Sequence, residues 1–121
     1  MSIIGGLIAE SLRVGSVLEG VTLTVTKVSR ADVGDTEAGQ PRTWTFLDFE
    51  ASDSDADDLA TALERVLHGG WYCDFRSQAE TFVVFSGRTF RYPRGDESGR
   101  AAAADYARSL GVPEAQLDWP S

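Results

Sequence analysis

The sequence predicts an α+β fold: a mainly antiparallel sheet of about six strands with two helices on one face. Three observations lead to this prediction. Strand-like segments fall into two groups, an amphipathic helix separates the groups, and a second helix follows them. Strands segregated from helices in this way favour antiparallel pairing, because short turns can join successive strands. The expected order of elements is βββαβββα, with a layered arrangement of ferredoxin-like character.

The N-terminal half contains three expected strands. The segment 7–13 is the first, and the alternation of apolar residues with threonine over 21–26 is the second. This alternation slips at Lys27–Val28, which predicts a bulge or the end of the strand. The aperiodic acidic segment at about 31–42 is expected to be a long loop. Trp44–Glu50 then resumes as the third strand.

A helix is predicted over about 55–67, with Asp53 or Ser54 as its N-cap. Carboxylates crowd its first turn, where the helix dipole favours them. One face carries an apolar stripe made of Leu59, Ala62, Leu63, Val66 and Leu67. The pair Gly69–Gly70 ends this helix.

Three short aromatic-rich runs between Gly69 and Asp96 predict a β-meander. The run Thr81–Phe85 is almost entirely apolar, which indicates an inner strand flanked by two half-exposed ones. Asp96 is the expected N-cap of a second helix that runs to Leu110, and Gly111 supplies its C-terminal stop. Leu117 and Trp119 follow, and this much apolar surface predicts that the C-terminal segment packs back on the domain.

Length and composition indicate one domain, 1–121, with a single core. The N-terminal segment lacks the pattern of a secretory signal and no apolar run reaches the length of a membrane span, so a cytoplasmic location and no membrane partner are expected. Cys73 is the only cysteine, so no disulfide can form within the chain. The net charge of −8 argues against binding of nucleic acid, since that affinity comes from Lys and Arg on phosphates.

The acidic residues are concentrated in one region of the chain. Between residues 32 and 64 there is one base, Arg42, and ten acids, namely Asp32, Asp35, Glu37, Asp48, Glu50, Asp53, Asp55, Asp57, Asp58 and Glu64. This region is expected to steer the protein toward basic partners or to keep it in solution. Asp53, Asp55, Asp57 and Glu64 have the spacing of a calcium loop, but Asp58 stands where that loop requires glycine, so neither a metal nor a cofactor is expected.

The segments GGWYCDF, ETFVVFSGRTFRYPRGD and YARSLGVPEAQLDWP resemble a group of short bacterial proteins from high-GC genomes that have no assigned function. The resemblance covers about 44–120. It implies a free-standing small protein and carries no activity that could be transferred to this chain.

Arginines in the meander are the first candidate site. Arg88, Arg91 and Arg94, with Arg76 nearby and a helix N-terminus behind them, could hold a small anionic ligand. Alternation places Arg88 and Arg94 on one strand face and Arg91 on the other. The alternative is that these arginines pair with the acidic first helix and with Asp74 or Glu80.

Aromatic residues are the second candidate site, because they occupy both faces of the expected strands. If helices cover only one face, Trp44, Tyr72 or Tyr92 would lie on an open sheet surface, which is typical of an interface. No catalytic set is assembled, and Cys73 shares its strand face with Trp71 and Phe75, so its thiol is expected in the core.

Two functions follow from these patterns. The first is a non-catalytic module for protein association, with itself as a homodimer or with a partner, through an open sheet face. The alternative is a small anion-binding protein or enzyme with a sheet–helix pocket, in which arginines hold the ligand and Asp48 or Asp74 is the acid–base residue.

Overall fold

A computed structural model describes residues 2–34 and 40–121. Within them the expected order βββαβββα is confirmed, with three short 3-10 turns added. The elements are β1 (Ser2–Ile8), η1 (Ala9–Ser11), β2 (Thr24–Asp32), β3 (Thr43–Ser52), η2 (Asp53–Asp55), α1 (Ala56–Val66), β4 (Tyr72–Arg76), β5 (Glu80–Phe85), β6 (Arg88–Pro93), α2 (Glu97–Ser109) and η3 (Glu114–Gln116).

The six strands form one open sheet in the order β2-β3-β1-β4-β5-β6, and every neighbouring pair is antiparallel. The N-terminal strand β1 therefore lies in the middle, between β3 and β4. Because both of these run antiparallel to β1, they are parallel to each other, and α1 connects them across the sheet. β2 and β6 are the two edges.

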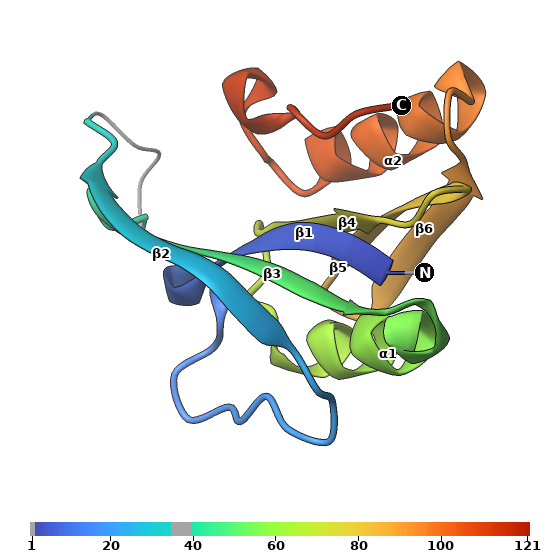
Figure 1. The fold of residues 1–121 in the computed structure, drawn as a ribbon. Helices are drawn as coiled ribbons and strands as arrows, with labels where there is room; N and C mark the ends of the chain where they lie inside the picture. The colour runs from blue at the N-terminus through green and yellow to red at the C-terminus, as the bar shows by residue number, and fades with distance from the viewer. Residues whose placement is uncertain (1, 35–39) are drawn as a thin grey trace.

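The expectation that both helices lie on one face is wrong, and the ferredoxin-like character fails with it. α1 and α2 cover opposite faces of the sheet (Figure 1). The reason lies in β5, which is buried on both sides: Phe82 and Val84 pack toward α1, whereas Val83 and Phe85 pack toward α2. A strand that is apolar on both faces needs a cover on each.

The first strand occupies 2–8 instead of the expected 7–13. Gly5 and Gly6, which interrupt the apolar run in the sequence, lie inside β1. Gly5 is required there by close packing: a Cβ on it would lie 2.6 Å from the Cβ of Phe75 and 2.7 Å from the carbonyl oxygen of Asp74. Glycine in a strand interior often marks such a close approach, and here it allows β1 to fit between β3 and β4.

The second strand also begins later than expected, at Thr24, and continues to Asp32. The predicted irregularity is present as a register shift between Val25 and Lys27, one position before the expected slip. The expected loop at 31–42 is shorter, because residues 31–32 belong to β2, and residues 35–39 of that loop lie outside the described residues.

Both helices lie close to their predicted bounds. α1 starts at Ala56, and Asp55 occupies its N-cap position, so the prediction of Asp53 or Ser54 as the N-cap is wrong. The Ser52 side chain caps the preceding 3-10 turn η2 by accepting a bond from the Ser54 backbone. Capping of α2 by Asp96 is confirmed, since its carboxylate accepts bonds from the backbone N–H groups of Ser98 and Gly99.

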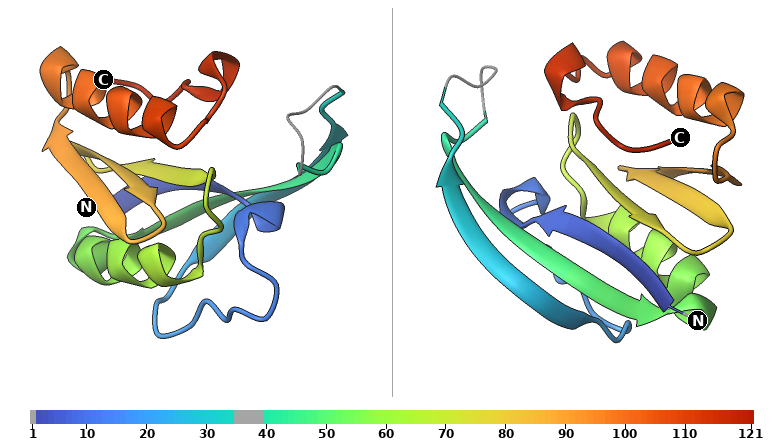
Figure 2. Two further views of the ribbon diagram at one scale, coloured as in Figure 1. Left: turned by 180° about the vertical axis from the view of Figure 1, so that it is seen from behind. Right: turned by 45° about the horizontal axis from the view of Figure 1, so that its top comes forward.

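The C-terminal segment packs on the domain, as predicted. Trp119 is 2% exposed and belongs to the core under α2. The segment runs beside α2 on the same face of the sheet, hereafter the upper face (Figure 2). Together they cover β4, β5 and β6, whereas no helix of the described residues lies over the upper face of β1, β3 and β2 (Figures 1 and 2). The candidate site lies at the border between the covered and the open half.

Candidate functional site

A pocket of about 340 Å³ opens on the upper face, where the C-terminal segment ends its cover of the sheet. We call it the aromatic–acidic pocket. Its walls come from the aromatic residues Trp44, Phe46, Trp71 and Tyr72, the carboxylates of Asp48, Asp74 and Asp118, and Gly6, Leu7, Ile8, Ala115 and Gln116. Among the residues that the structure describes, no Lys, Arg or His lines it.

The sheet register places two of the carboxylates on either side of a glycine. Gly6 of β1 is paired with Asp48 of β3 on one side and with Asp74 of β4 on the other. Neighbouring strands lie about 4.8 Å apart, so the two aspartate backbones are about 10 Å apart across Gly6. A Cβ on Gly6 would lie 3.5 Å from Oδ1 of Asp48. The missing side chain therefore leaves the floor of the pocket open between the two acids.

The aromatic wall is a packed cluster. The ring of Trp44 lies 5.1 Å from that of Trp71 and 6.2 Å from that of Phe46, both in tilted arrangements. The indole N–H of Trp44 donates to the carbonyl of Pro41 at 2.8 Å, which fixes the orientation of the ring. Trp44 and Trp71 are 9% and 8% exposed and Phe46 is half-buried, so the cluster is preformed next to the carboxylates but exposes little of its surface.

The C-terminal segment forms the third wall. The hydroxyl of Tyr72 lies against the carboxylate of Asp118 and the backbone carbonyl of Gln116. The ring of Tyr72 packs edge-on against Trp119 at 4.8 Å, and the side-chain amides of Gln116 and Gln40 bond at 3.1 Å. Burial, together with the bond to Asp118, raises the pKa of Tyr72, so the phenol stays neutral. The segment is held by packing and by hydrogen bonds together.

Asp74 is a half-buried carboxyl in this pocket, and Arg76 compensates its charge only in part. Burial raises the pKa of its carboxyl to about 6, the nearby Asp118 adds to the effect, and Arg76 opposes it. Among the described residues, neither Asp74 nor Asp48 forms an ion pair. A partly buried carboxylate without an ion pair destabilises the fold when it is charged, so the pocket is acidic at a cost in stability.

We expect Asp74→Asn to stabilise the protein near neutral pH. The pKa of about 6 in the native state lies above the ordinary 3.8, so the native state holds the proton more tightly than the unfolded chain. The resulting stabilisation is complete below pH 4 and is lost as the pH rises through 6. At pH 7.5 the variant should gain on the order of 1–2 kcal/mol, after allowance for partial exposure.

The measurement is urea denaturation at pH 4.5 and pH 7.5. Asp58→Asn, an exposed position on α1 across the sheet, is the matched control and should keep the pH dependence of the wild type. If Asp74→Asn showed the same difference between the two pH values as the wild type, the assignment of the titration to Asp74 would be wrong.

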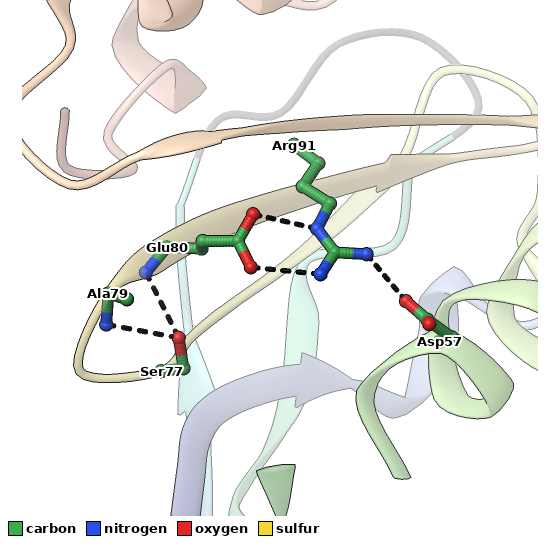
Figure 3. Close-up of polar contacts among 5 residues, drawn as sticks. All are labelled: Asp57, Ser77, Ala79, Glu80 and Arg91. Atoms are coloured by element: carbon green, nitrogen blue, oxygen red, sulfur yellow. Dashed lines mark hydrogen bonds and ion pairs between the residues drawn. The ribbon is translucent and has the colours of Figure 1, made fainter. Parts of the chain in front are cut away.

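The structure separates the four arginines of the predicted anion site. Arg91 lies on the α1 side, where its guanidinium makes two bonds to the Glu80 carboxylate, at 2.7 and 2.9 Å, and one to Asp57 at 2.6 Å (Figure 3). It also lies over the ring of Phe82 at 4.8 Å. The alternative pairing with the acidic helix and Glu80 is therefore the observed one for Arg91.

The other three arginines do not converge on one point either. Arg88 packs its guanidinium over the rings of Phe90 and Tyr106, at 4.5 and 4.8 Å, on the α2 side. Arg76 and Arg94 do come together, at a shallow hollow beside Ser2, Ile4 and Gln78. Arg94 is held there by a long bond, 3.5 Å, to the carbonyl of Ser77.

Of the three predicted interface residues, Trp44 and Tyr72 line the pocket, but only Tyr72 is half-buried. Trp44 is 9% exposed, so the expectation that it lies on an open sheet surface is wrong. Tyr92 is 3% exposed, and its hydroxyl donates to the carbonyl of Pro120. Tyr92 is therefore part of the core.

Asp48 and Asp74, which the sequence analysis named as possible acid–base residues, both line the pocket. The sequence analysis missed Gly6 and Asp118 as site residues. The alternation of side chains along β4 indicates that Tyr72 and Asp74 share one face. No local sequence pattern connects these two residues to the C-terminal segment.

The thiol and the acidic cluster belong to the structural framework. Cys73 is buried, as expected, and its Sγ donates to the carbonyl of Gly6 at 3.3 Å. Burial raises the pKa of this thiol, which disfavours the nucleophilic thiolate. Glu64 accepts a bond from the Thr89 hydroxyl. In the part of the chain that the structure describes, no three acidic, histidine or cysteine side chains are placed to hold a metal ion.

The fold and site define a single-sheet α+β protein with helices on opposite faces and an aromatic–acidic pocket at the border of the uncovered half of one face. Comparison with known proteins finds no matching family model, no matching curated protein and no matching solved structure. Among the described residues, no helix is both long enough and apolar enough to cross a membrane.

Proposed function

We propose that the protein is a non-catalytic association module that binds a partner protein through the open half of its upper face. The observation that carries the proposal is the pocket itself: aromatic surface beside three carboxylates, at the border of the part of the sheet that neither helix covers. Aromatic residues concentrated at a concave, uncovered site are typical of binding surfaces.

The hollowed surface continues beyond the pocket, which suits a chain segment better than a compact ligand. A second hollow, lined by Ile4, Thr26, Glu50 and Arg76 among others, shares Gly6, Asp48 and Asp74 with the pocket. The hollow at Arg76 and Arg94 adjoins it through Ile4 and Arg76. The three together follow β1 from Ile8 to Ser2, about 20 Å at the usual rise of a strand. An extended peptide segment matches this shape.

A partner protein is favoured over a second copy of this chain. The net charge of −8 makes the approach of two copies unfavourable, and the pocket adds local negative charge. Homodimerisation remains the direct competitor. Light scattering coupled to size-exclusion chromatography at several protein concentrations separates the two, and a stable dimer would replace the partner proposal with self-association.

Selection from a displayed library of ten-residue random peptides on the immobilised full chain tests the proposal. Peptides should be enriched that bind the wild type and lose binding to Gly6→Leu, whose side chain fills the pocket floor. Gly69→Leu is the matched control, because a Cβ on Gly69 meets no atom within 4 Å and the residue is not part of the pocket. The proposal would be contradicted if no peptide were enriched, or if the enriched peptides bound Gly6→Leu as well as they bind the wild type.

The anion-binding alternative now depends on Arg76 and Arg94, the two arginines that share one hollow. Thermal-shift screening with phosphorylated and carboxylated metabolites tests it, since a ligand that binds the native state raises the melting temperature. A shift that disappears in Arg76→Gln but persists in Gly6→Leu would support the alternative over the association module.

A further inference from the structure

We infer that the aromatic–acidic pocket binds a basic side chain, lysine or arginine, presented by an extended segment of the partner. This rests on the proposed function and specifies the chemistry of its contact. It combines two features of the same concave site: aromatic rings that can face the apolar stem and the charge of the ligand, and carboxylates at the pocket floor that can accept its N–H groups.

The charge of the pocket selects a cation. Asp48 and Asp74 flank Gly6 on either side, and Asp118 also lines the pocket. In the described part of the chain, no basic residue lines it. Neither floor carboxylate has an ion-pair partner among the described residues, in contrast to Asp57, which Arg91 holds. Asp48 is exposed and Asp74 is half-buried. Among the described residues, no positive group in the walls of the pocket pairs with either carboxylate, so a cationic ligand would supply one.

The aromatic wall distinguishes this pocket from a merely acidic surface. Trp44 contacts both Phe46 and Trp71 in this wall, and Tyr72 lines the pocket beside the C-terminal segment. A cation near a tryptophan or tyrosine face is attracted by the ring quadrupole, and methylene groups gain from the same surface. A hydrated metal ion would use neither property, whereas a lysine or arginine side chain uses both.

The groove along β1 indicates that the cation belongs to a peptide. Beyond Asp48 and Asp74 the hollow leads past Ile4 to Arg76, which offers an opposite charge at a distance from the pocket. A free amine would fill the pocket alone and leave the groove empty. A segment that extends along β1 would contact both regions.

The test is an NMR titration of the isotope-labelled full chain at 150 mM NaCl with capped peptides Gly-Gly-X-Gly-Gly. X is arginine or lysine in the charged probes, and citrulline or norleucine in the neutral probes of similar length. The salt suppresses the general attraction of a chain with net charge −8. The charged peptides should shift the amide signals of Gly6 and Asp74 and bind at least about tenfold more tightly than the neutral ones.

Three variants locate the binding. Asp48→Asn and Asp74→Asn should each weaken binding of the arginine and lysine peptides about tenfold, whereas Asp58→Asn, which removes an equal charge on α1, should leave it unchanged. Both pocket variants keep the size of the side chain, and their folding is checked by denaturation. Equal binding of charged and neutral peptides, or equal weakening by Asp58→Asn, would overturn the inference.

Failure of this inference is distinguishable from failure of the proposed function. Library peptides that need Gly6 but contain no lysine or arginine would retain the association module and overturn the cation specificity. Binding of butylamine and methylguanidine at the pocket, without any Gly6-dependent peptide, would retain the cation specificity and overturn the protein partner.

Discussion

Removal of residues 112–121 is expected to destabilise the protein by at least about 3–5 kcal/mol, the range for deleting a buried aromatic side chain. The ring of Trp119 is 2% exposed and packs edge-on against Tyr72 and Phe85, at 4.8 and 6.4 Å. The guanidinium of Arg100 donates to the carbonyls of Leu117 and Trp119, at 2.8 and 3.0 Å. A small domain has roughly 5–15 kcal/mol of stability in total, so the truncated chain should be marginal.

Urea denaturation of the full chain, of 1–111 and of Trp119→Ala measures this effect. Trp119→Ala should account for most of the loss of stability, because it removes the buried ring. It leaves the backbone bonds of the segment in place, so any further loss in 1–111 measures their contribution. Glu114→Gln is the control: it weakens only the exposed pair with Arg108 and should change stability by less than about 0.5 kcal/mol. Equal midpoints for the full chain and 1–111 would mean that the segment does not stabilise the fold.

Gly5→Ala is expected to have the second largest effect after the truncation, although it adds a single methyl group. The new Cβ would lie 2.6 Å from the Cβ of Phe75, 2.7 Å from the carbonyl oxygen of Asp74 and 2.9 Å from the ring of Phe49. The first two atoms belong to the β4 backbone or sit directly on it, so relief requires β1 and β4 to separate. Overpacking of a rigid core costs about 1–3 kcal/mol or more, and this central position should reach the upper end.

Gly6→Ala is the matched control for this substitution. The two glycines are adjacent in β1, but the Cβ of alanine at position 6 would meet only Oδ1 of Asp48, at an ordinary 3.5 Å. We expect its denaturation midpoint to stay close to that of the wild type. If Gly5→Ala and Gly6→Ala had the same stability, the close approach of β1 to β4 would be wrong.

The sequence determined those features that depend on short-range patterns. The alternation and apolar runs of 72–93 identified the meander, the stripe on α1 identified that helix, and Asp96 and Gly111 marked the ends of α2. The burial of Trp119 also followed from the sequence, because an apolar terminal segment is stabilised by packing. Each of these rests on residues close together in the chain.

The tertiary structure alone decided where the N-terminal strand lies and which side each helix covers. Gly5 and Gly6 weaken a strand by intrinsic propensity, so the sequence favoured a later start. In the structure, Phe75 and Phe49 lie so close to Gly5 that only glycine fits there, so close packing outweighs the low strand propensity of glycine. The two-sided burial of β5 was visible in its unbroken apolar run, but the run does not specify that one helix covers each side.

The candidate site was also decided by tertiary structure, in which β1 inserts between β3 and β4. That order brings Asp48 and Asp74 to either side of Gly6, and the C-terminal segment adds Asp118 from the far end of the chain. The sequence supplied the residue types, including Trp44 and Tyr72, but not their neighbours, because strand order depends on contacts distant in sequence. The alternation along the strand already indicated that Arg91 and Arg88 lie on opposite faces, and the structure confirms it.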